Sequence, residues 1–274
     1  MSTSGPSVPP PRSPQGDGTG VRCAKVDALR TPSSPGVFSH EDWTVVLRKF
    51  VDERGWVDYN GLANDSEVFD GYIARLERQG PKNRPDLFPS PQSRLAYYLN
   101  AYNAMVFKGV LARGPKIKTV WSGLVSGLSF FGLMTITVGG QKMNLKILED
   151  KLIRARFKDP RVHAALNCAS ISCPRLQREA LQGEILDQQL DKAMREFVND
   201  PEHCTVNETK RVVHLSKIFE WFKDDFLGYE RSQGNSKPVL LDYVNRYRDA
   251  GAQLPRHYRV RSNPYDKGLN RRPV

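Results

Sequence analysis

The sequence has few cysteines, no long hydrophobic run and no excess of acidic residues. Four cysteines in 274 residues are too few for a disulfide-stabilised scaffold. The longest apolar stretch, over 123–134, is interrupted by glycines and is much shorter than the roughly 20 residues of a membrane-spanning helix. The first residues also lack the basic start and apolar block of a secretory signal. These absences predict a cytoplasmic protein with reduced thiols and no membrane span.

Basic residues outnumber acidic ones by 41 to 30, which gives a net charge of +11. The excess is greatest over 246–274, where eight Lys and Arg residues accompany two Asp residues. A basic segment can bind phosphate-rich partners by releasing counterions. However, it occurs here without aromatic-rich RNP strands, zinc-finger spacing or a basic heptad region. We therefore interpret it as a solvated surface and do not expect nucleic acid as a partner.

Composition divides the chain into three segments. Residues 1–37 are rich in proline, glycine and serine and have little to bury, which predicts a disordered tail. Residues 38–270 carry helical periodicity with short strand patterns between the helices. They predict one helix-rich α+β domain with short β-hairpins. Residues 271–274 form a basic C-terminal end.

Three helices are expected in the first half of the domain. The segment from Ser39 resembles a capping box and precedes an apolar stripe, which predicts a helix that ends at Gly55. A second helix is expected after Asp65. The third has the strongest pattern, because Ser90 and the following proline suit its start, and its long apolar stripe ends at Gly114.

Hairpins and further helices are expected in the second half. The glycine pair at 139–140 predicts a tight hairpin over 135–143, and Asn144 is expected to cap the helix that follows. The segment 161–167 is compatible with either strand or helix. Further helices are expected near 178–199, 216–227 and 237–250, with a short hairpin about Asn207.

Two asparagines interrupt the buried stripe of the third helix. Asn100 and Asn103 lie among apolar residues, and a buried amide must find hydrogen-bonding partners. One interpretation is a structural amide that binds the backbone of a neighbouring loop, which we favour slightly. The other is a role in substrate binding.

A carboxylate also lies on an apolar helix face. Glu149 follows Leu145 by four residues and precedes Leu152 by three. A carboxyl group held there is expected to have a raised pKa or to pair with Arg or His. The alternative is a residue at the rim of the face that reaches solvent.

The densest polar block runs from His163 to Pro174 and holds one imidazole, two thiols, two hydroxyls and an amide. Pro174 is suited to open a helix, which would place Cys173 at its N-cap and lower the pKa of the thiol. His163 would then act as base or thiolate partner, and Cys173 as nucleophile. Asn167 and Cys168 are expected to help bind the substrate.

Three alternatives apply to these thiols. They are inert if they are simply buried as small apolar side chains, which we consider the commonest case. A metal site would use His163, Cys168 and Cys173 with His203 or Cys204, but this spacing matches no standard zinc pattern. A redox disulfide between Cys168 and Cys173 is sterically feasible, although it lacks the Cys-x-x-Cys spacing. We expect neither a metal nor a cofactor.

A second carboxylate lies toward the core side of a predicted helix. Asp225 is seven residues after Ile218, on a helix that Ser216 is expected to cap. It is suited to orient His163, as a carboxylate orients the base of a catalytic triad. Pairing with a basic side chain or a position at the surface are the alternatives.

Together these motifs resemble the family called domain of unknown function 547. The resemblance covers roughly 38–270, and its His-to-Cys-Pro block is highly specific. The motifs that carry it are Trp56-Val57-Asp58-Tyr59, Leu99-Asn100-Ala101-Tyr102-Asn103-Ala104, the block Asp159 to Pro174, Leu215-Ser216-Lys217-Ile218-Phe219-Glu220-Trp221, and Asn263-Pro264-Tyr265-Asp266-Lys267-Gly268-Leu269-Asn270.

The resemblance supplies no mechanism, because the family's activity is unassigned. It implies a shared site lined by Asn103, Glu149, His163 and Asp225. Plant members often carry serine where this chain has Cys168 and Cys173, so the resemblance also implies that thiol chemistry is not shared by all members.

Two functions of different class follow. The first is a thiol-dependent hydrolase or acyltransferase, in which Cys173 attacks a carbonyl, His163 moves the proton, and Glu149 or Asp225 holds the imidazole. Amides of Asn103 or Asn167 would hold the oxyanion, and the partner would be a small molecule. The second is a protein-interaction module that presents the apolar loop over 123–134, with Trp121, to an unknown protein partner. An enzyme requires His163 and Cys173 to converge in a pocket.

Overall fold

The structure is a computed structural model that describes residues 1, 36–114, 116–122 and 127–273. Two units divide the chain, Met1–Arg30 and Thr31–Val274, and the fold described here belongs to the second. The predicted disordered tail over 1–37 lies almost entirely outside the described residues. The second unit is helix-rich with two small sheets, so the predicted α+β class is confirmed. No helix in the described parts of the chain has both the length and the apolar composition to cross a bilayer.

The central helix is α5, Pro91–Ala112. Its start matches the prediction, because the Ser90 side chain accepts a hydrogen bond from the Ser93 amide, and the Ser93 side chain accepts one from the Ser90 amide. Pro91 occupies the first turn, and the helix ends shortly before Gly114, whose φ is +89°. Most of its residues are buried, which is typical of a helix that lies inside a core.

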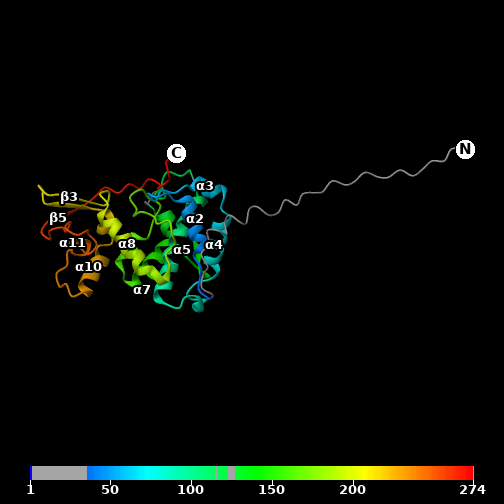
Figure 1. The fold of residues 1–274 in the computed structure, drawn as a ribbon, viewed down its shortest axis with the longest axis horizontal. Helices are drawn as coiled ribbons and strands as arrows, with labels where there is room; N and C mark the ends of the chain where they lie inside the picture. Colours follow the sequence, from blue (N-terminus) through cyan, green and yellow to red (C-terminus); the bar gives the residue numbers. More distant parts are fainter. Residues whose placement is uncertain (2–35, 115, 123–126, 274) are drawn as a thin grey trace. The chain divides into compact units, whose positions relative to one another are not determined.

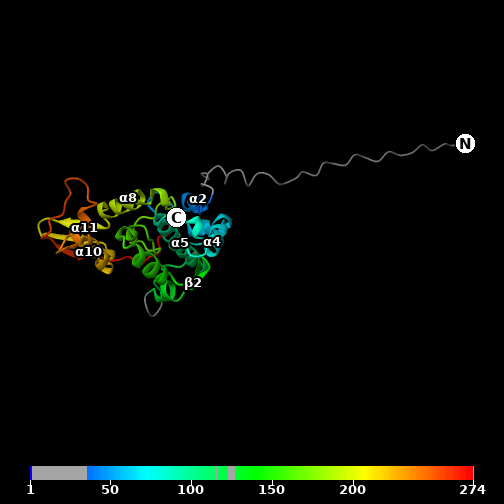
Figure 2. The same ribbon diagram turned by 90° about the horizontal axis from the view of Figure 1, so that it is seen from below.

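Two of the predicted helices pack beside α5 (Figures 1 and 2). They are α2, Glu41–Phe50, and α4, Glu67–Arg78. The start predicted for α2 is one residue wrong, since His40 and not Ser39 is the N-cap, and the helix ends well before Gly55. Between them lies the short helix α3, Tyr59–Asn64, which the sequence did not predict.

The predicted hairpin and the capped helix after it are both present. Strands β1, Ile136–Val138, and β2, Gln141–Met143, are antiparallel, and positive φ values at the two glycines form the turn. Asn144 accepts a hydrogen bond from the Ile147 amide at 2.8 Å. The helical segment that follows comprises α6, the wider π-helical turn η3 and α7, whose bounds are Leu145–Ile147, Leu148–Arg154 and Ala155–Phe157.

The segment after Pro174 differs most from the prediction. No helix begins at Pro174, and the chain is extended until η5, Gly183–Ile185, and α8, Leu186–Asn199. The reason is that side chains of other elements take its backbone groups. Asn100 binds both the amide and the carbonyl of Leu181, and Thr44 accepts a hydrogen bond from the Ala180 amide. These bonds replace those that a helix would have formed.

A second hydrophobic core lies in the C-terminal part. The predicted hairpin about Asn207 is confirmed as β3, Cys204–Asn207, and β4, Val212–Leu215. A third strand, β5, Arg259–Ser262, pairs in parallel with β4 and was not predicted. The helix predicted over 216–227 is divided into two, and that predicted over 237–250 is shorter. The helices are α9, Lys217–Trp221, α10, Lys223–Ser232, and α11, Leu240–Asn245.

The last residues return from the second core to the first. In Figure 1 this segment is red and runs from β5 toward the region of α2 and α3. The amide of Ile171 donates to the carbonyl of Gly268 at 2.8 Å, and the amide of Asn270 donates to the carbonyl of Ala169 at 3.1 Å. The amide of Arg272 reaches Val57. The C-terminal segment therefore lies against the loop that carries the two thiols.

Candidate functional site

A cleft with a volume of about 110 Å³ brings together several of the predicted site residues. Its polar members come from α5, η3, the 3₁₀ turn η4 (Pro160–Ala164), the thiol loop and the C-terminal segment. The lining residues are Tyr102, Trp121, Phe131, Glu149, His163, Leu166, Cys168, Ile218, Trp221, Phe222 and Tyr265. The four Phe and Trp side chains among them make its walls mostly apolar. Glu149, His163 and Cys168, predicted from sequence, thus share one cavity.

Two free thiols lie side by side at this cleft. The sulfur of Cys168 is 2.9 Å from that of Cys173, and the Cys168 amide donates to the Cys173 sulfur at 3.1 Å. The hydroxyl of Tyr265 is 3.3 Å from both sulfurs. Cys168 is partly exposed and lines the cleft, whereas Cys173 lies behind it with 6% of its surface exposed.

A tight turn places the two thiols together. Ala169 has a φ of +62°, which costs an alanine roughly 1–3 kcal/mol, and such strain is common at functional sites. The side-chain oxygen of Asn167 accepts a hydrogen bond from the Ala169 amide, and the Cys173 amide donates to the backbone carbonyl of Ser170. The C-terminal segment, paired with this loop, holds the strained conformation.

The surroundings of the two thiols shift their pKa values in opposite directions. Hydrogen bonds from Cys173, Ser170 and Tyr265 to the Cys168 sulfur lower the pKa of Cys168 to about 7, against the opposing effect of burial. Burial and the nearby Cys168 thiolate raise the pKa of Cys173. The helix N-cap predicted to activate Cys173 is absent, so this part of the prediction is wrong. Cys168 is the thiol that ionises first.

His163 is buried and pairs with Asp225, which is partly exposed. Its Nε2 lies 2.8 Å from the Asp225 carboxylate, which also accepts a hydrogen bond from Arg154 Nε at 2.7 Å. The His163 ring stacks on Phe222, with centroids 4.0 Å apart. If Nε2 carries the proton that Asp225 accepts, then Nδ1 is left with a lone pair. Asp225 therefore orients the ring, as the sequence suggested it could.

Burial keeps this imidazole neutral while its partner stays charged. Burial lowers the pKa of His163, and the Asp225 carboxylate offsets only part of this effect. Burial by itself would raise the pKa of Asp225, but hydrogen bonds from His163 and Arg154 lower it to about 2. At neutral pH the pair is thus a neutral imidazole bound to a carboxylate.

Glu149 is held in the wide turn η3 and is partly buried. Burial, with a smaller effect from the charge of Asp150, raises its pKa to about 7. The charge on Cys168 contributes to this raised pKa, whereas the hydrogen bond between the carboxyl group and the Tyr102 hydroxyl lowers it. A π-helical turn is frequent at functional sites because it displaces side chains from the regular helical positions.

The asparagines predicted to bind substrate are used by the fold. Asn103 binds the Ala165 carbonyl and the Asn167 amide, and Asn167 binds the Pro174 carbonyl and the Ala169 amide. None of them lines the cleft, and Asn100 and Asn103 border only a separate cavity of about 20 Å³. These contacts match the structural alternative. The substrate-binding role of Asn100, Asn103 and Asn167 stays a prediction without support from their positions.

Two arrangements considered from the sequence do not assemble among the described residues. No hydrogen bond joins His163 to either thiol of the pair, although His163 and Cys168 face the same cleft. Within the parts of the chain that the structure describes, no group of three or more His, Cys, Asp or Glu side chains is suited to hold a metal ion. Cys204 instead lies in the second hydrophobic core.

Sequence reasoning missed three contributors to the site. Tyr102 was counted only as part of the apolar stripe, and Tyr265 only as part of a C-terminal motif. Trp121 donates from Nε1 to the Ser170 hydroxyl at 2.7 Å and was assigned to a loop. The polar ends of buried tyrosines and tryptophans need hydrogen-bonding partners, and this rule could have indicated that all three residues lie next to polar groups.

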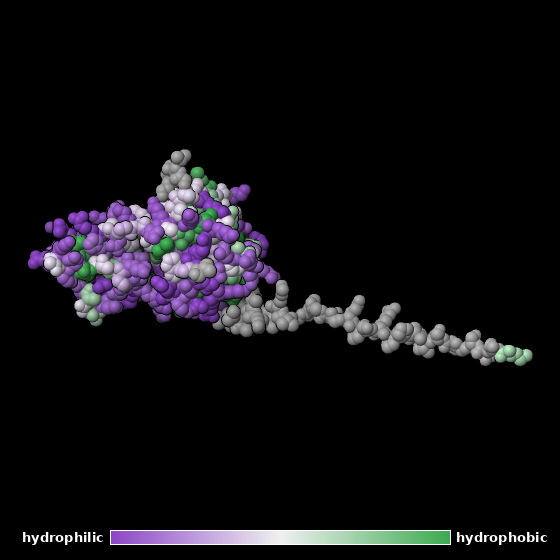
Figure 3. Space-filling model, turned by 90° about the horizontal axis from the view of Figure 1, so that it is seen from above, coloured by the Kyte–Doolittle hydropathy of each residue, from purple (hydrophilic) through white to green (hydrophobic). Residues whose placement is uncertain are grey.

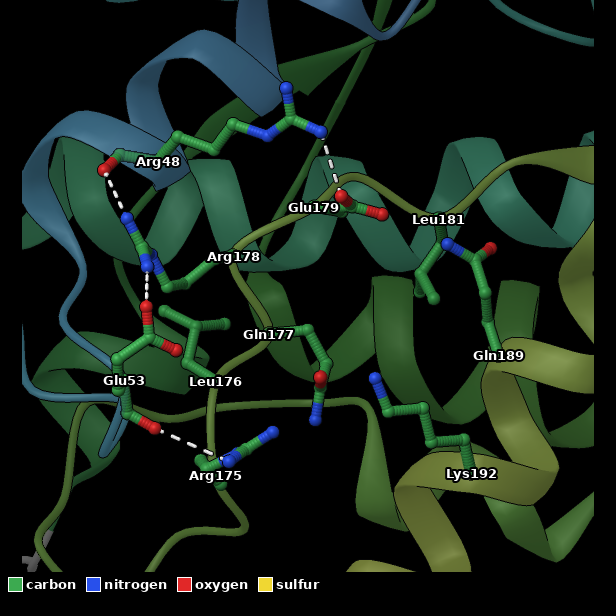
Figure 4. A pocket seen from close by; sticks show the side chains of 10 residues that line it. All are labelled: Arg48, Glu53, Arg175, Leu176, Gln177, Arg178, Glu179, Leu181, Gln189 and Lys192. Atoms are coloured by element: carbon green, nitrogen blue, oxygen red, sulfur yellow. Dashed lines mark hydrogen bonds and ion pairs between the residues drawn. The ribbon is translucent and has the colours of Figure 1, made fainter.

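A larger cavity of about 330 Å³ lies on α2, the extended segment over 175–181 and α8 (Figure 4). Four cations line it, but carboxylates already pair with them: Arg48 with Glu179 at 2.7 Å, Arg178 with Glu53, and Arg175 and Lys192 with Glu196. Three carboxylates thus offset most of the positive charge of these four cations. We therefore assign the candidate site to the cleft with the thiols.

The fold and the cleft define an α+β protein with an ionisable thiol in an aromatic pocket. Residues 88–198 match the model of the family described as "Protein of unknown function, DUF547". Residues 88–198 therefore carry a segment of this family, in agreement with the resemblance predicted from the motifs. The match includes Glu149, His163 and both thiols, whereas Asp225 and Tyr265 lie outside it. No curated protein and no solved structure gave a significant match.

Proposed function

We propose that this protein is a thiol-dependent hydrolase or acyltransferase whose nucleophile is Cys168. One observation carries the proposal: a thiol with a pKa of about 7 shares a cleft with Glu149 and with the oriented imidazole of His163. A thiol that ionises near neutral pH is the usual nucleophile of cysteine-dependent acyl transfer. Cys168 thus replaces Cys173 in the role predicted from sequence.

The first step is attack of the Cys168 thiolate on the carbonyl carbon of an ester, thioester or amide. The Tyr265 hydroxyl lies 3.3 Å from the sulfur and is a hydrogen-bond donor beside the developing oxyanion. The backbone amides of Cys168 and Ala169 already bind Cys173 and Asn167, so they do not form an oxyanion hole in this conformation.

Glu149 is suited to move the proton. With a pKa of about 7, a substantial fraction of Glu149 is protonated in the pH range in which Cys168 ionises, because each negative charge disfavours the other. The carboxyl group protonates the leaving group and then, as a carboxylate, removes a proton from the water or amine that releases the acyl group. His163 Nδ1 is a second base at the same cleft.

The cleft favours a small, uncharged acyl group. Its volume is about 110 Å³, and aromatic side chains of Trp121, Phe131, Trp221 and Phe222 form much of its wall. A charged acyl group would lose its hydration there without an opposite charge to replace it. We therefore propose a small-molecule substrate, and the required free thiol suits a protein of the reducing cytoplasm.

The structure favours an enzyme over an interaction module. The face drawn in Figure 3 is largely hydrophilic, and its hydrophobic areas are limited in extent. Residues 123–126 of the apolar loop expected to bind a partner lie outside the described residues. Among the large apolar side chains of the loop that the structure describes, Leu133 is the most exposed, at 68%. Trp121 faces the cleft instead of solvent.

Hydrolysis of p-nitrophenyl acetate and butyrate tests the proposal. We expect a burst of one nitrophenolate per chain, followed by slower turnover, and an acetyl group on the Cys168 peptide in mass spectrometry. Cys168→Ala should abolish both signals, whereas Cys204→Ala, which removes a thiol in the second core, should leave them unchanged. A burst that survives in Cys168→Ala, or no burst in the intact protein, contradicts the proposal.

A further inference from the structure

The two thiols of the loop differ in access as well as in charge. Cys168 faces the cleft, while Cys173 is buried directly behind it with its sulfur 2.9 Å away. A small reagent that enters the cleft therefore meets Cys168 first. Once Cys168 has been modified, the nearest thiol to react with it is Cys173. This order of access is what a two-cysteine reduction of a peroxide requires.

We propose that the protein also reduces small organic hydroperoxides, with Cys168 attacking the peroxide and Cys173 completing a disulfide. This activity uses the same nucleophile as the acyl chemistry above but does not depend on it. Cys-x-x-Cys spacing is not needed, because a turn already brings the sulfurs together. The turn is closed by the hydrogen bond from the Cys173 amide to the Ser170 carbonyl and by the left-handed Ala169.

The chemistry balances without a metal or cofactor. The Cys168 thiolate attacks the terminal oxygen of ROOH, which gives a sulfenic acid on Cys168 and releases RO⁻ that leaves as ROH after accepting a proton from Glu149. The Cys173 thiol then attacks the Cys168 sulfur, so that an S–S bond forms, the S–O bond breaks and water leaves. In sum, two thiols and one hydroperoxide give a disulfide, an alcohol and water. A small dithiol returns the pair to its reduced form.

The polar groups around Cys168 are suited to the first step. The hydroxyls of Ser170 and Tyr265 lie 3.4 Å and 3.3 Å from its sulfur and can donate hydrogen bonds to the peroxide oxygens. Trp121 fixes the Ser170 hydroxyl at 2.7 Å. The aromatic walls favour an alkyl group over water, so a compact organic hydroperoxide is a better substrate than a bulky charged one.

Cys173 also limits further oxidation. A sulfenic acid without a neighbouring thiol is oxidised by a second peroxide to a sulfinic acid, which a dithiol does not reduce. With Cys173 in contact, disulfide formation removes the sulfenic acid before this occurs. Replacing Cys173 is therefore expected to change the product on Cys168 and not only the rate.

The test treats the full chain with tert-butyl hydroperoxide, first at equimolar concentration and then with dithiothreitol as reductant. We expect peptide mapping to show a Cys168–Cys173 disulfide, and peroxide consumption to continue while dithiothreitol lasts. Cys168→Ser should reduce consumption to the uncatalysed rate, whereas Cys204→Ser should match the intact protein. In Cys173→Ser, treated with excess peroxide and without dithiothreitol, Cys168 should accumulate as sulfinic acid.

Two results overturn the inference. One is an intact protein in which Cys168 remains a thiol under equimolar peroxide. The other is one in which Cys168 becomes sulfinic acid without a disulfide to Cys173. Both are measured on the intact protein, so a Cys173 variant that fails to fold does not affect the decision. A protein that hydrolyses p-nitrophenyl esters but ignores the peroxide contradicts this inference alone.

Discussion

The sulfur of Cys168 lies 2.9 Å from that of Cys173, yet only Cys168 reaches the cleft. Because two thiolates at this distance repel each other strongly, one ionises and the other stays protonated and donates a hydrogen bond to it. The position of each thiol decides which: Cys168 has Ser170 as an additional donor, and Cys173 is more deeply buried. The pair is therefore an activated thiol with its own hydrogen-bond donor.

Removing the Tyr265 hydroxyl is expected to weaken this activation. A hydrogen bond to a charged group contributes roughly 1.5 kcal/mol, so Tyr265→Phe should raise the pKa of Cys168 by about one unit. The readout is the pH midpoint of Cys168 alkylation by iodoacetamide. Tyr258→Phe is the matched control, since its hydroxyl binds Glu208 at the surface, far along the chain from the thiol loop. An unchanged midpoint in Tyr265→Phe would show that Tyr265 does not stabilise the thiolate.

Glu149→Gln is expected to separate catalysis from stability. Without a proton donor, ester hydrolysis should fall roughly 10²–10⁴-fold while alkylation of Cys168 continues. Stability should change in the opposite direction. The folded pKa of Glu149 is raised to about 7, so the wild type loses stability as pH rises from about 4.5 to 7, and the neutral glutamine avoids this cost.

Urea unfolding at pH 5 and pH 8 measures this effect. At pH 8 Glu149→Gln should be more stable than the wild type by about 2–3 kcal/mol, and at pH 5 the difference should be small. Lower stability than the wild type at pH 8 would mean that the Glu149 carboxylate is a structural partner and not a strained functional group.

The Asp225 carboxylate is expected to contribute a pH-dependent part of the stability. Its folded pKa of about 2 lies below the unfolded value, so the contribution is present above pH 4 and disappears as pH falls from about 4 to 2. At pH 7, Asp225→Ala should lower the free energy of unfolding by about 2–4 kcal/mol, because His163 loses its partner and Arg154 keeps only Asp150. Asp224→Ala, on the exposed neighbour, is the control and should change it by less than about 0.5 kcal/mol.

The loss in Asp225→Ala should shrink as pH approaches 2, which urea unfolding across pH 2–7 will show. A difference that is the same at all these pH values would mean that packing, and not the carboxylate charge, is what the substitution removes.

Two asparagines on the same helix give a matched pair for the thiol loop. Asn103→Ala leaves the Ala165 carbonyl and the Asn167 amide without a partner, and Asn100→Ala does the same to Leu181. Each should lower stability by about 2–4 kcal/mol. Only Asn103→Ala should also alter the rate of Cys168 alkylation, because only Asn103 holds the residue next to Cys168. Equal effects of the two substitutions on alkylation would show that Asn103 does not position the thiol loop.

The sequence predicted those parts of the fold that depend on neighbours in the chain. The apolar stripe and capping serine of α5, the glycine turn of the hairpin and the Asn144 cap are local signals, and each one is present in the structure. The helix expected at Pro174 failed because Asn100 and Thr44, about 80 and 136 residues from their partners, take its backbone groups. Strand β5 was not predicted for the same reason, since its pairing with β4 is a long-range contact.

The candidate site was predicted in its residue types but not in its geometry. The dense block from His163 to Pro174 does lie at the cleft, and Asp225 does contact His163. The sequence could not show which thiol faces the cleft, because this depends on the turn at Ala169 and on the C-terminal segment behind it. The place of Tyr265 beside both sulfurs depends on the same segment, which is about 90 residues further along the chain.

The central claim is that Cys168 is the activated thiol, and the pH dependence of its alkylation tests this most directly. Iodoacetamide labelling of the intact chain, read peptide by peptide between pH 5 and pH 10, reports every cysteine in one experiment. The account predicts a midpoint near 7 for Cys168, with Cys173 and Cys204 modified only well above that pH. A Cys168 midpoint at or above the roughly 8.5 of a free thiol, or faster labelling of Cys173 than of Cys168, would contradict it.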